Sequence, residues 1–486
     1  MVPIILSTIT ARYSHSAFGL RYLHANLGKW KEQSQIKEFH LKQSPLFIAE
    51  SILQDKPKIV GIGVYIWNVR EITEVVQIIK KVSPQTTIII GGPEVSYEYE
   101  DMTIFKEADY LICGEAEHIF PQLVKIIMSG QLPPRKVWEG TITDVNSLFL
   151  PYEEYTYEDI AHRIIYVESS RGCPFHCEFC LSAIKPGVRF FDRVQFLNEM
   201  EKLIQRGAKN FTFVDRTFNI REEHALEILR FFLKHIKEGM RIHFEIVPDK
   251  LSEKILTEFT KFPKGILHLE VGLQTVNLKT QELISRRQDL SKTFEVLRFL
   301  KEKTGAKIHA DLVAGMPAET WDSFRKGFNY LIELAPQEIQ LGILKRLRGA
   351  HISRHIKEYQ MAFAPFPPYE ILQTSTLSFE KLQKLKRMAR YLELYYNQGN
   401  FPNSLKFLWE TGTTPFDAFS DFSDYIWTKT GKTHELSLST LAHLLFSYLL
   451  AINKFPPDII EKAIREDYNQ KPGRTEKLNI SKKIPK

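Results

Sequence analysis

The sequence predicts an α/β protein in which two regions of parallel strands are followed by a mainly helical region. Short runs rich in β-branched residues alternate with amphipathic helical stretches from residue 3 to residue 343, which is typical of parallel strands joined by crossover helices. The alternation ends at a proline-rich segment, residues 363–368, after which only helical periodicity continues. A chain of 486 residues is long enough for two or three domains. We expect the divisions 1–140, 141–160 (a linker), 161–364, 365–470 and 471–486 (a tail).

The first region has the pattern of an open, doubly wound, Rossmann-like sheet. Its strand-like runs are residues 3–7, 36–41, 59–64, 87–91 and 110–112. Such sheets bind ligands beyond the carboxyl ends of their strands. Glycines gather at these ends, where they permit a close approach to a ligand but can also simply form turns: Gly61, Gly63, Gly91, Gly92 and Gly114. No G-x-G-x-x-G follows the first run, so a dinucleotide site is not indicated.

The second region contains six βα units. Helical stretches such as 195–205 and 222–236 separate its strand-like runs, which are residues 163–167, 210–214, 241–246, 266–271, 307–313 and 338–343. Regular alternation of this kind predicts parallel strands with the helices outside. Polar residues that follow these runs are therefore expected to meet at one edge of the sheet.

Three of the four cysteines lie within eight residues, directly after the first of these six runs. Cys173, Cys177 and Cys180 stand in the segment R-G-C-P-F-H-C-E-F-C-L. Thiolates so close in sequence can converge on a soft metal centre, and three of them can hold three irons of a 4Fe–4S cluster, leaving the fourth iron open. A disulfide would leave an odd cysteine, and a zinc site would need His176 of the same loop as its fourth ligand. The remaining Cys113 is expected to be a small buried hydrophobe at a strand end.

The C-x-x-x-C-x-x-C spacing, with the aromatic Phe179 before the third cysteine, resembles the signature of the radical S-adenosylmethionine (SAM) enzymes. The resemblance implies a partial (β/α)6 TIM-type barrel, a 4Fe–4S metal site and SAM bound at its open iron. One-electron reduction would then cleave SAM to methionine and a 5′-deoxyadenosyl radical. The electron would come from an external low-potential donor of the flavodoxin or ferredoxin type.

The same resemblance implies which other residues meet this cofactor. Asp215 follows the second run and would face the methionine part, in a segment that lacks the common Gly-Gly-Glu form. Glu270 and Gln274 resemble positions that meet the ribose or ammonium group, and Gly315 and Met316 resemble the segment near adenine. The alternatives for this last segment are that its glycine simply forms a turn and that Glu319 is an acidic residue at a helix N-terminus.

A second set of motifs resembles the cobalamin-binding branch of this superfamily. Gly-Gly-Pro-Glu at 91–94 is followed by Asp-Tyr-Leu-Ile-Cys-Gly-Glu at 109–115 and then by the cysteine loop. The segment 10–23 further resembles a bacterial subfamily with an uncharacterised C-terminal domain. The Asp-x-His-x-x-Gly signature is absent, so His15 is interpreted as a loop or capping residue and not as a cobalt ligand. The residues implied to contact cobalamin are Gly63, Tyr65, Gly91, Gly92, Pro93, Gly114 and Glu115.

The resemblance implies methyl transfer to an unactivated carbon of an unknown small-molecule or peptide substrate. A second hypothesis is cobalamin-dependent oxidative cyclisation or rearrangement without methylation. Methylthio transfer to transfer RNA would need three further cysteines, and only Cys113 remains. A non-catalytic cobalamin or iron–sulfur sensor or carrier is the last alternative, although simple electron carriers use four cysteines.

Charge and hydropathy exclude several partner classes. The net charge is +7, of which the tail 471–486 contributes +5, so the rest carries only +2 and no nucleic-acid surface is indicated. We expect a disordered tail, no membrane span and a cytoplasmic location. The aromatic residues after 379 are interpreted as helical core in preference to the wall of a substrate cavity. Arg346 and Arg348 could pair with an anionic substrate, although surface arginines are commoner.

Overall fold

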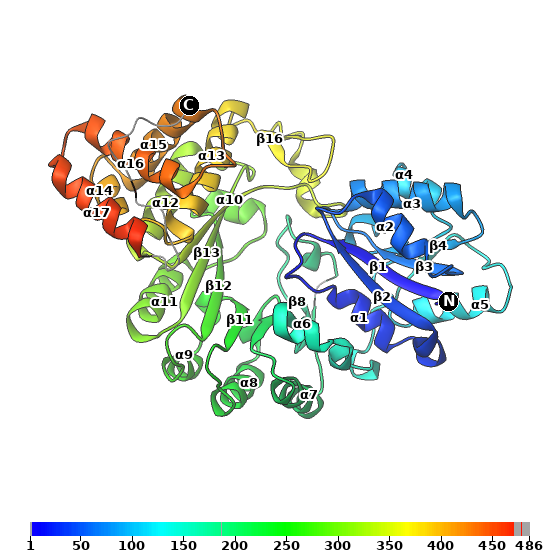
Figure 1. Ribbon diagram of the computed structural model, residues 1–486. Helices are drawn as coiled ribbons and strands as arrows, with labels where there is room; N and C mark the ends of the chain where they lie inside the picture. The colour runs from blue at the N-terminus through cyan, green and yellow to red at the C-terminus, as the bar shows by residue number, and fades with distance from the viewer. Residues whose placement is uncertain (1, 186, 471–477, 479–486) are drawn as a thin grey trace.

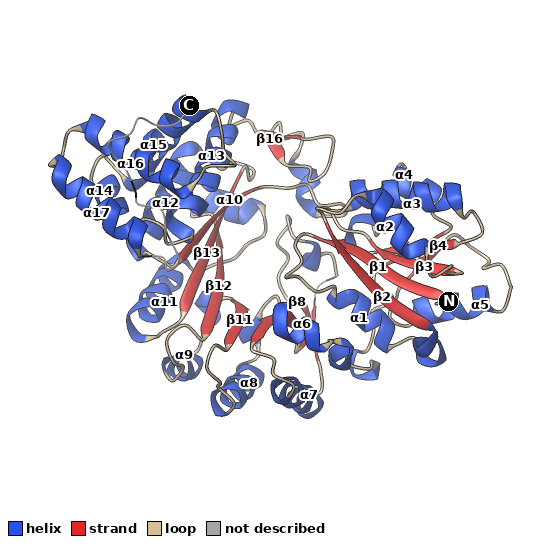
Figure 2. Cartoon of the chain, in the orientation of Figure 1, coloured by secondary structure: helices blue, strands red, loops and turns tan. Residues whose placement is uncertain are grey.

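The computed structural model describes residues 2–185, 187–470 and 478. It contains two parallel sheets and a helical C-terminal region, which confirms the predicted α/β architecture (Figures 1 and 2). The expected disordered tail, 471–486, lies outside the described residues except for Leu478. None of the helices that the structure describes has both the length and the apolar character needed to cross a bilayer.

The N-terminal sheet has the strand order β2-β1-β3-β4-β5-β6, and all of its pairings are parallel. Helices cover both of its faces, so β1 is buried along its whole length, as expected for a parallel sheet. The five predicted runs became strands, and β6 was not predicted. The strands are β1 Ile4–Thr10, β2 Ser34–His40, β3 Ile59–Gly63, β4 Thr87–Gly91, β5 Tyr110–Cys113 and β6 Val137–Glu139. Their helices are α1 Phe18–Ala25, α2 Pro45–Leu53, α3 Val69–Val82, α4 Thr103–Glu107 and α5 Ile119–Met128.

The segment that joins the two sheets packs against both of them. It ends in α6, Tyr157–His162, which begins with a capping box formed by Thr156 and Asp159. Asp159 also pairs with Arg21 of α1 at 2.9 Å, and Arg21 pairs at the same distance with Glu38 of β2. All three side chains are buried, where breaking an ion pair is costly because it leaves the other charge uncompensated. This network holds the N-terminal sheet against the start of the second one.

The second sheet is open and parallel, with the strand order β14-β13-β12-β11-β10-β7. Helices from the connections between its strands pack on its outer face, so it forms the predicted partial barrel (Figure 1). The strands are β7 Ile165–Val167, β10 Asn210–Phe213, β11 Arg241–Ile246, β12 Leu267–Gln274, β13 Lys307–Ala314 and β14 Glu338–Ile343. The helices are α7 Arg193–Gln205, α8 Glu222–Lys234, α9 Glu253–Thr260, α10 Leu278–Leu283, α11 Leu290–Lys303 and α12 Trp321–Leu334.

Strict alternation along β12 separates an apolar outer face from a polar inner face. Every second residue from Leu267 to Leu273 is buried against the outer helices. The residues between them, His268, Glu270, Gly272 and Gln274, are only half-buried and face the barrel interior. The interior is therefore lined by polar side chains.

An antiparallel hairpin carries the cysteine loop, and the sequence patterns did not predict it. Its strands are β8, Ser170–Cys173, and β9, Gly187–Phe190. Gly172 has a φ of 102°, and a Cβ atom there would collide with the carbonyl oxygen of Gly187. Glycine is therefore required directly before the first cysteine.

The C-terminal region packs its first helix against the edge strand β14. A short hairpin precedes it, formed by β15 Ala362–Phe363 and β16 Ile371–Gln373. The helices are α13 Phe379–Leu392, α14 Ser404–Trp409, α15 Pro415–Thr430, α16 Leu438–Ile452 and α17 Pro457–Asn469. Their aromatic residues are mostly buried in one core that is continuous with that of the barrel, in agreement with the core interpretation.

A π-helical turn, Glu393–Asn397, covers part of the exposed edge of β14. The Asn397 side chain accepts a hydrogen bond from the Ile339 N–H at 2.9 Å and donates one to the Ile339 carbonyl at 3.0 Å. It thereby replaces the neighbouring strand that an edge strand lacks.

We predict that Asn397→Ala lowers the free energy of unfolding by about 1–3 kcal/mol, because it leaves two backbone groups of β14 without partners. Denaturant titration followed by fluorescence measures this. Lys301→Ala, on the exposed face of α11, is the control and should change little. Equal stability of Asn397→Ala and the control would show that the edge does not depend on this side chain.

Candidate cofactor sites

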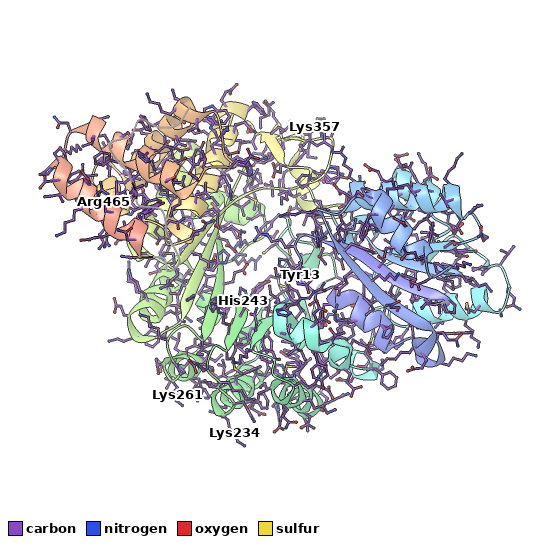
Figure 3. The ribbon with its side chains drawn as sticks, in the orientation of Figure 1. Tyr13, Lys234, His243, Lys261, Lys357 and Arg465 are labelled. Carbon is purple, nitrogen blue, oxygen red and sulfur yellow. The ribbon has the colours of Figure 1, made fainter. Side chains whose placement is uncertain are left out.

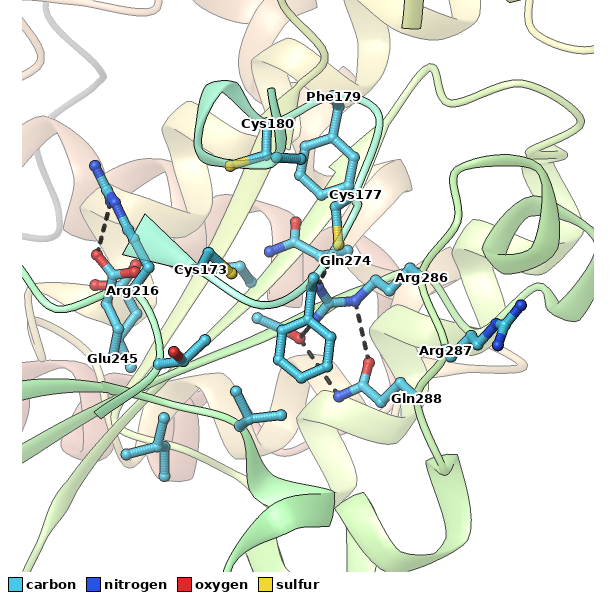
Figure 4. A pocket seen from close by; sticks show the side chains of 18 of the residues that line it. Cys173, Cys177, Phe179, Cys180, Arg216, Glu245, Gln274, Arg286, Arg287 and Gln288 are labelled. Atoms are coloured by element: carbon cyan, nitrogen blue, oxygen red, sulfur yellow. Dashed lines mark hydrogen bonds and ion pairs between the residues drawn. The ribbon is translucent and has the colours of Figure 1, made fainter. Parts of the chain in front are cut away.

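A pocket at the carboxyl ends of the barrel strands contains all three cysteines of the motif (Figure 4). It encloses about 910 Å³ of space, part of it open to solvent. The cysteine loop forms one wall, the segments after β10 and β11 form another, and β12, β13 and the segment 286–288 complete it. Of the sequence-predicted residues, the pocket is lined by Cys173, Cys177, Phe179, Cys180, Glu270 and Gln274.

The three thiols are free and lie at the pocket wall. Burial raises the pKa of Cys173 and of Cys177. The guanidinium of Arg286 partly offsets this rise for Cys177, because its Nη1 lies 3.7 Å from the Cys177 Sγ. Metal binding would deprotonate these thiols. Among the described residues, no group of three or more His, Cys, Asp and Glu side chains lies close enough together to hold a single metal ion.

Glu178, inside the cysteine motif, holds the loop in place. Its buried carboxylate accepts hydrogen bonds from Ser285 Oγ at 3.0 Å and from Arg354, and it lies 2.8 Å from His355 Nε2. Its backbone also bonds to Ile284 and Ile352. The loop is thus attached to the segment before Arg286 and to the segment after β14. Sequence reasoning did not identify this role, because the partners lie more than 100 residues away.

Gln274 closes β12 in an unusual backbone conformation. Its φ is 65°, in the left-handed region, and a register shift occurs between Gly272 and Gln274. Strained residues of this kind cluster at functional sites. The side chain folds over Gly272, where a Cβ atom would collide with it.

Asp215 does not reach the pocket. Its carboxylate is buried and accepts hydrogen bonds from the Ser169 N–H at 2.9 Å and from the hydroxyls of Ser169 and Ser170, both at 2.6 Å. It therefore holds the strand that leads into the cysteine loop. The next two residues, Arg216 and Thr217, line the pocket instead.

The structure also keeps Gly315 and Met316 out of this pocket. Gly315 has a φ of 90° and is covered by Ile371 of β16, and Met316 is fully buried. Glu319 accepts hydrogen bonds from Thr275 and Ser323, so it is held within the protein just before α12. These contacts agree with the alternative that Glu319 is an acidic residue at the start of a helix.

A second pocket, of about 880 Å³, lies at the carboxyl ends of β3, β4 and β5. Its wall is largely apolar, with side chains from α1 and α5. Tyr65 stacks on Trp67, with ring centroids 4.4 Å apart, and burial raises the pKa of its phenol. Of the predicted cobalamin contacts, the pocket is lined by Gly63, Tyr65, Gly91, Gly92, Gly114 and Glu115, and Pro93 is not among its lining residues.

Arg171 connects the two pockets. It lines the second pocket and stands two residues before Cys173, which lines the first. Its guanidinium pairs with Glu168 at 2.6 Å and with Glu117 at 2.7 Å. Arg189, its partner across the β8–β9 hairpin, pairs with Glu115. The hairpin is therefore attached to the N-terminal domain by ion pairs from both of its strands.

The other residues named from the sequence, His15, Cys113, Arg346 and Arg348, make contacts within the protein. His15 Nδ1 lies 2.6 Å from the Tyr166 hydroxyl, and His15 is not among the described residues that line the second pocket. Cys113 ends β5, where burial raises its pKa to about 11. Arg346 pairs with Glu98, and Arg348 pairs with Glu94 at 3.2 Å. These two arginines join the segment after β14 to the N-terminal domain.

Three sequence families match the chain in succession. They are the B12 binding domain over residues 5–124, the radical SAM superfamily over 167–331, and a protein family of unknown function, DUF4080, over 357–482. The matches agree with the predicted order of cobalamin domain, radical SAM barrel and uncharacterised C-terminal domain.

Individual relatives share less than a quarter of their residues with this chain over the aligned regions. The anaerobic magnesium-protoporphyrin IX monomethyl ester cyclase of Rubrivivax gelatinosus is 24% identical over 58% of this chain and 55% of its own length. The cobalamin-dependent radical SAM methyltransferase TokK of Streptomyces tokunonensis is 23% identical over 62% of this chain and 50% of its own. The chain thus spans about half the length of these relatives.

The solved structure of OxsB, described as a cobalamin-dependent S-adenosylmethionine radical enzyme, shares the fold. It superposes with a TM-score of 0.64 at 11% identity, over 96% of this chain and 83% of that one. The predicted cofactors, a 4Fe–4S cluster, SAM and cobalamin, are confirmed at the level of these domains. The chain therefore contains a radical SAM domain, preceded by a B12 binding domain and followed by a DUF4080 domain.

Proposed function

We propose that this enzyme transfers a methyl group to an unactivated carbon of a small-molecule or peptide substrate. The observation that carries this proposal is the short connection between the two pockets, since Arg171 and Cys173 of one strand each line a different one. When bound, the cluster and SAM would supply a 5′-deoxyadenosyl radical to remove a hydrogen atom, and cobalamin would supply the methyl group. The relative TokK supports this reaction by its name.

The residues of the first pocket fit the cluster and SAM. Three free thiols in one loop, Cys173, Cys177 and Cys180, are proposed to hold three irons, and the pocket leaves room beside them for SAM. Phe179 and Gln274 also line this pocket and are proposed to contact SAM. Arg286 is an addition to this set, because it can donate a hydrogen bond to the Cys177 thiolate.

The second pocket fits cobalamin. Glycines remove side chains along the strand ends, and apolar side chains of α1 and α5 form the opposite wall. Tyr65 and Glu115 are proposed to contact the cofactor at this edge.

A second candidate is oxidative cyclisation without methylation, as the name of the Rubrivivax relative suggests. For either reaction the electrons come from outside the chain, from a proposed low-potential donor of the flavodoxin or ferredoxin type. The free cysteines agree with a reducing compartment, and we propose the cytoplasm.

SAM labelled in its methyl group distinguishes the two candidates. Methyl transfer uses two SAM molecules and two electrons, and yields labelled product, S-adenosylhomocysteine, methionine and 5′-deoxyadenosine. Deoxyadenosine without labelled product or S-adenosylhomocysteine would support cyclisation and overturn methyl transfer.

We predict that Cys173→Ala, Cys177→Ala and Cys180→Ala each abolish deoxyadenosine formation by the anaerobically reconstituted enzyme, because each removes one proposed iron ligand. Iron and sulfide analysis and chromatography of the products measure this. Cys113→Ala is the matched control, since Cys113 lies at the end of β5 in the other domain, and it should retain activity. Full activity in any of the three variants would contradict the ligand assignment.

We further predict that Glu178→Ala lowers iron content and broadens the electron paramagnetic resonance signal of the reduced cluster, because the loop loses its attachment to Ser285 and Arg354. Glu178→Gln should restore iron content in part, since an amide oxygen still accepts hydrogen bonds. The exposed Glu282→Gln serves as the control. A normal signal in Glu178→Ala would show that other contacts position the loop.

A further inference from the structure

The inner wall of the barrel carries ionisable side chains at positions that similar barrels fill with branched aliphatic residues. They lie in adjacent layers on three neighbouring strands, and Figure 3 labels one of them, His243 of β11. We call them the lumen cluster: His243 and Glu245 of β11, Glu270 of β12, and His309 and Asp311 of β13. Three of the five, Glu245, Glu270 and Asp311, line the pocket that contains the cysteines.

The backbone register explains why these side chains meet. Glu245 lies opposite Glu270, and Glu270 lies opposite His309. The result is a row of ion pairs across the barrel. His243 Nε2 lies 3.0 Å from Glu270, His309 Nε2 lies 3.0 Å from Asp311, and Arg216 donates to Glu245 at 3.0 Å.

The surroundings stabilise the charged forms of His309 and Glu270. Burial works against the protonated form of His309, but the hydrogen bond and charge of Asp311, together with Glu270, raise its pKa to about 9. Burial likewise works against the ionised form of Glu270, yet the hydrogen bond from His243 and the nearby positive charges lower its pKa. His309 is therefore a cation at neutral pH and Glu270 an anion.

The carboxylates of the cluster are only partly compensated. Arg216 pairs with Glu245 and the protonated His309 pairs with Asp311, yet burial and the neighbouring carboxylates still raise the pKa of Glu245 and of Asp311. Their side chains are partly accessible from the pocket, and the β12 and β13 residues that line it are polar residues and one glycine: Glu270, Gly272, Gln274 and Asp311. A buried excess of negative charge is costly unless a positive ligand compensates it.

Unpartnered acceptors nearby point independently to a ligand. Asp249, beyond the end of β11, is 3% exposed and lines the pocket, and its Oδ1 has no hydrogen-bond partner among the described residues. The hydroxyl of Thr217, 2% exposed, lacks a partner in the same way. Buried polar atoms without partners are rare in folded proteins, so these two atoms are expected to meet a donor from a bound molecule.

We propose that the lumen cluster binds a protonated amine of the substrate. This assignment rests on the proposed radical chemistry and narrows its substrate to an amine-bearing molecule. The ammonium group supplies the missing positive charge, and its N–H groups donate to Asp311 and Glu245. The reacting part of the substrate then extends toward the cysteines, at the carboxyl ends of the same strands.

Fractionated extract of the source organism tests the proposal with the fully reconstituted enzyme. Ion-exchange resins at pH 7 divide the metabolites into cationic, neutral and anionic pools. Each pool is added with saturating SAM and reductant, and deoxyadenosine formation is measured against the rate without a pool. We expect the cationic pool to raise this rate, and acetylation of its amines to abolish the effect. Saturating SAM ensures that SAM in the pool contributes nothing.

Two variants test the residues. Asp311→Asn and Glu245→Gln should each increase by about tenfold the amount of cationic pool needed for half-maximal stimulation, with each variant compared with its own basal rate. Glu302→Gln, exposed on α11, is the control. Stimulation by the neutral pool, by the anionic pool or by the acetylated amines would overturn the proposal. So would basal cleavage that no pool stimulates, or half-maximal amounts that are unchanged in both variants. Absence of any SAM cleavage would instead contradict the proposed function.

Discussion

The ion pairs of Arg171 with Glu117 and Glu168 determine where the cysteine loop begins. All three side chains are largely buried, so water and salt screen these ion pairs only weakly. They attach the β8–β9 hairpin to the N-terminal domain, while Glu178 attaches the far side of the loop to the segments after β12 and β14. A loop held from both sides can keep three thiols in a fixed arrangement without a hydrophobic core of its own.

The interior of the barrel is lined by polar side chains and is not filled by an apolar core. Its stability comes from the outer face, where the apolar residues of the strands pack against the surrounding helices, and from the C-terminal helices that continue the same core. The inner face is thereby free to carry charges that would be expensive in a filled barrel. This division explains how one set of strands can be both a stable scaffold and the wall of a reactive site.

The strands and the three domains could be predicted because apolar runs and their alternation with helices are local properties of the sequence. The meeting of the three cysteines at one pocket could be predicted because they lie within eight residues of one loop. The roles of Asp215, Gly315 and Met316 could not be judged, because the residues that cover or bind them, Ser169 and Ile371 among them, are set by tertiary packing. The lumen cluster was missed except for Glu270, since its members come from three different strands and adjoin only through register.

The attachment of Glu178 also orders events during synthesis. Its partners Arg354 and His355 are made 176 and 177 residues later in the chain. While the ribosome is still translating the barrel, the cysteine loop lacks half of its supports. On the proposed ligand assignment, iron and sulfur delivered before residue 355 has emerged would meet a loop that lacks these contacts, so insertion of the cluster would follow synthesis of the barrel.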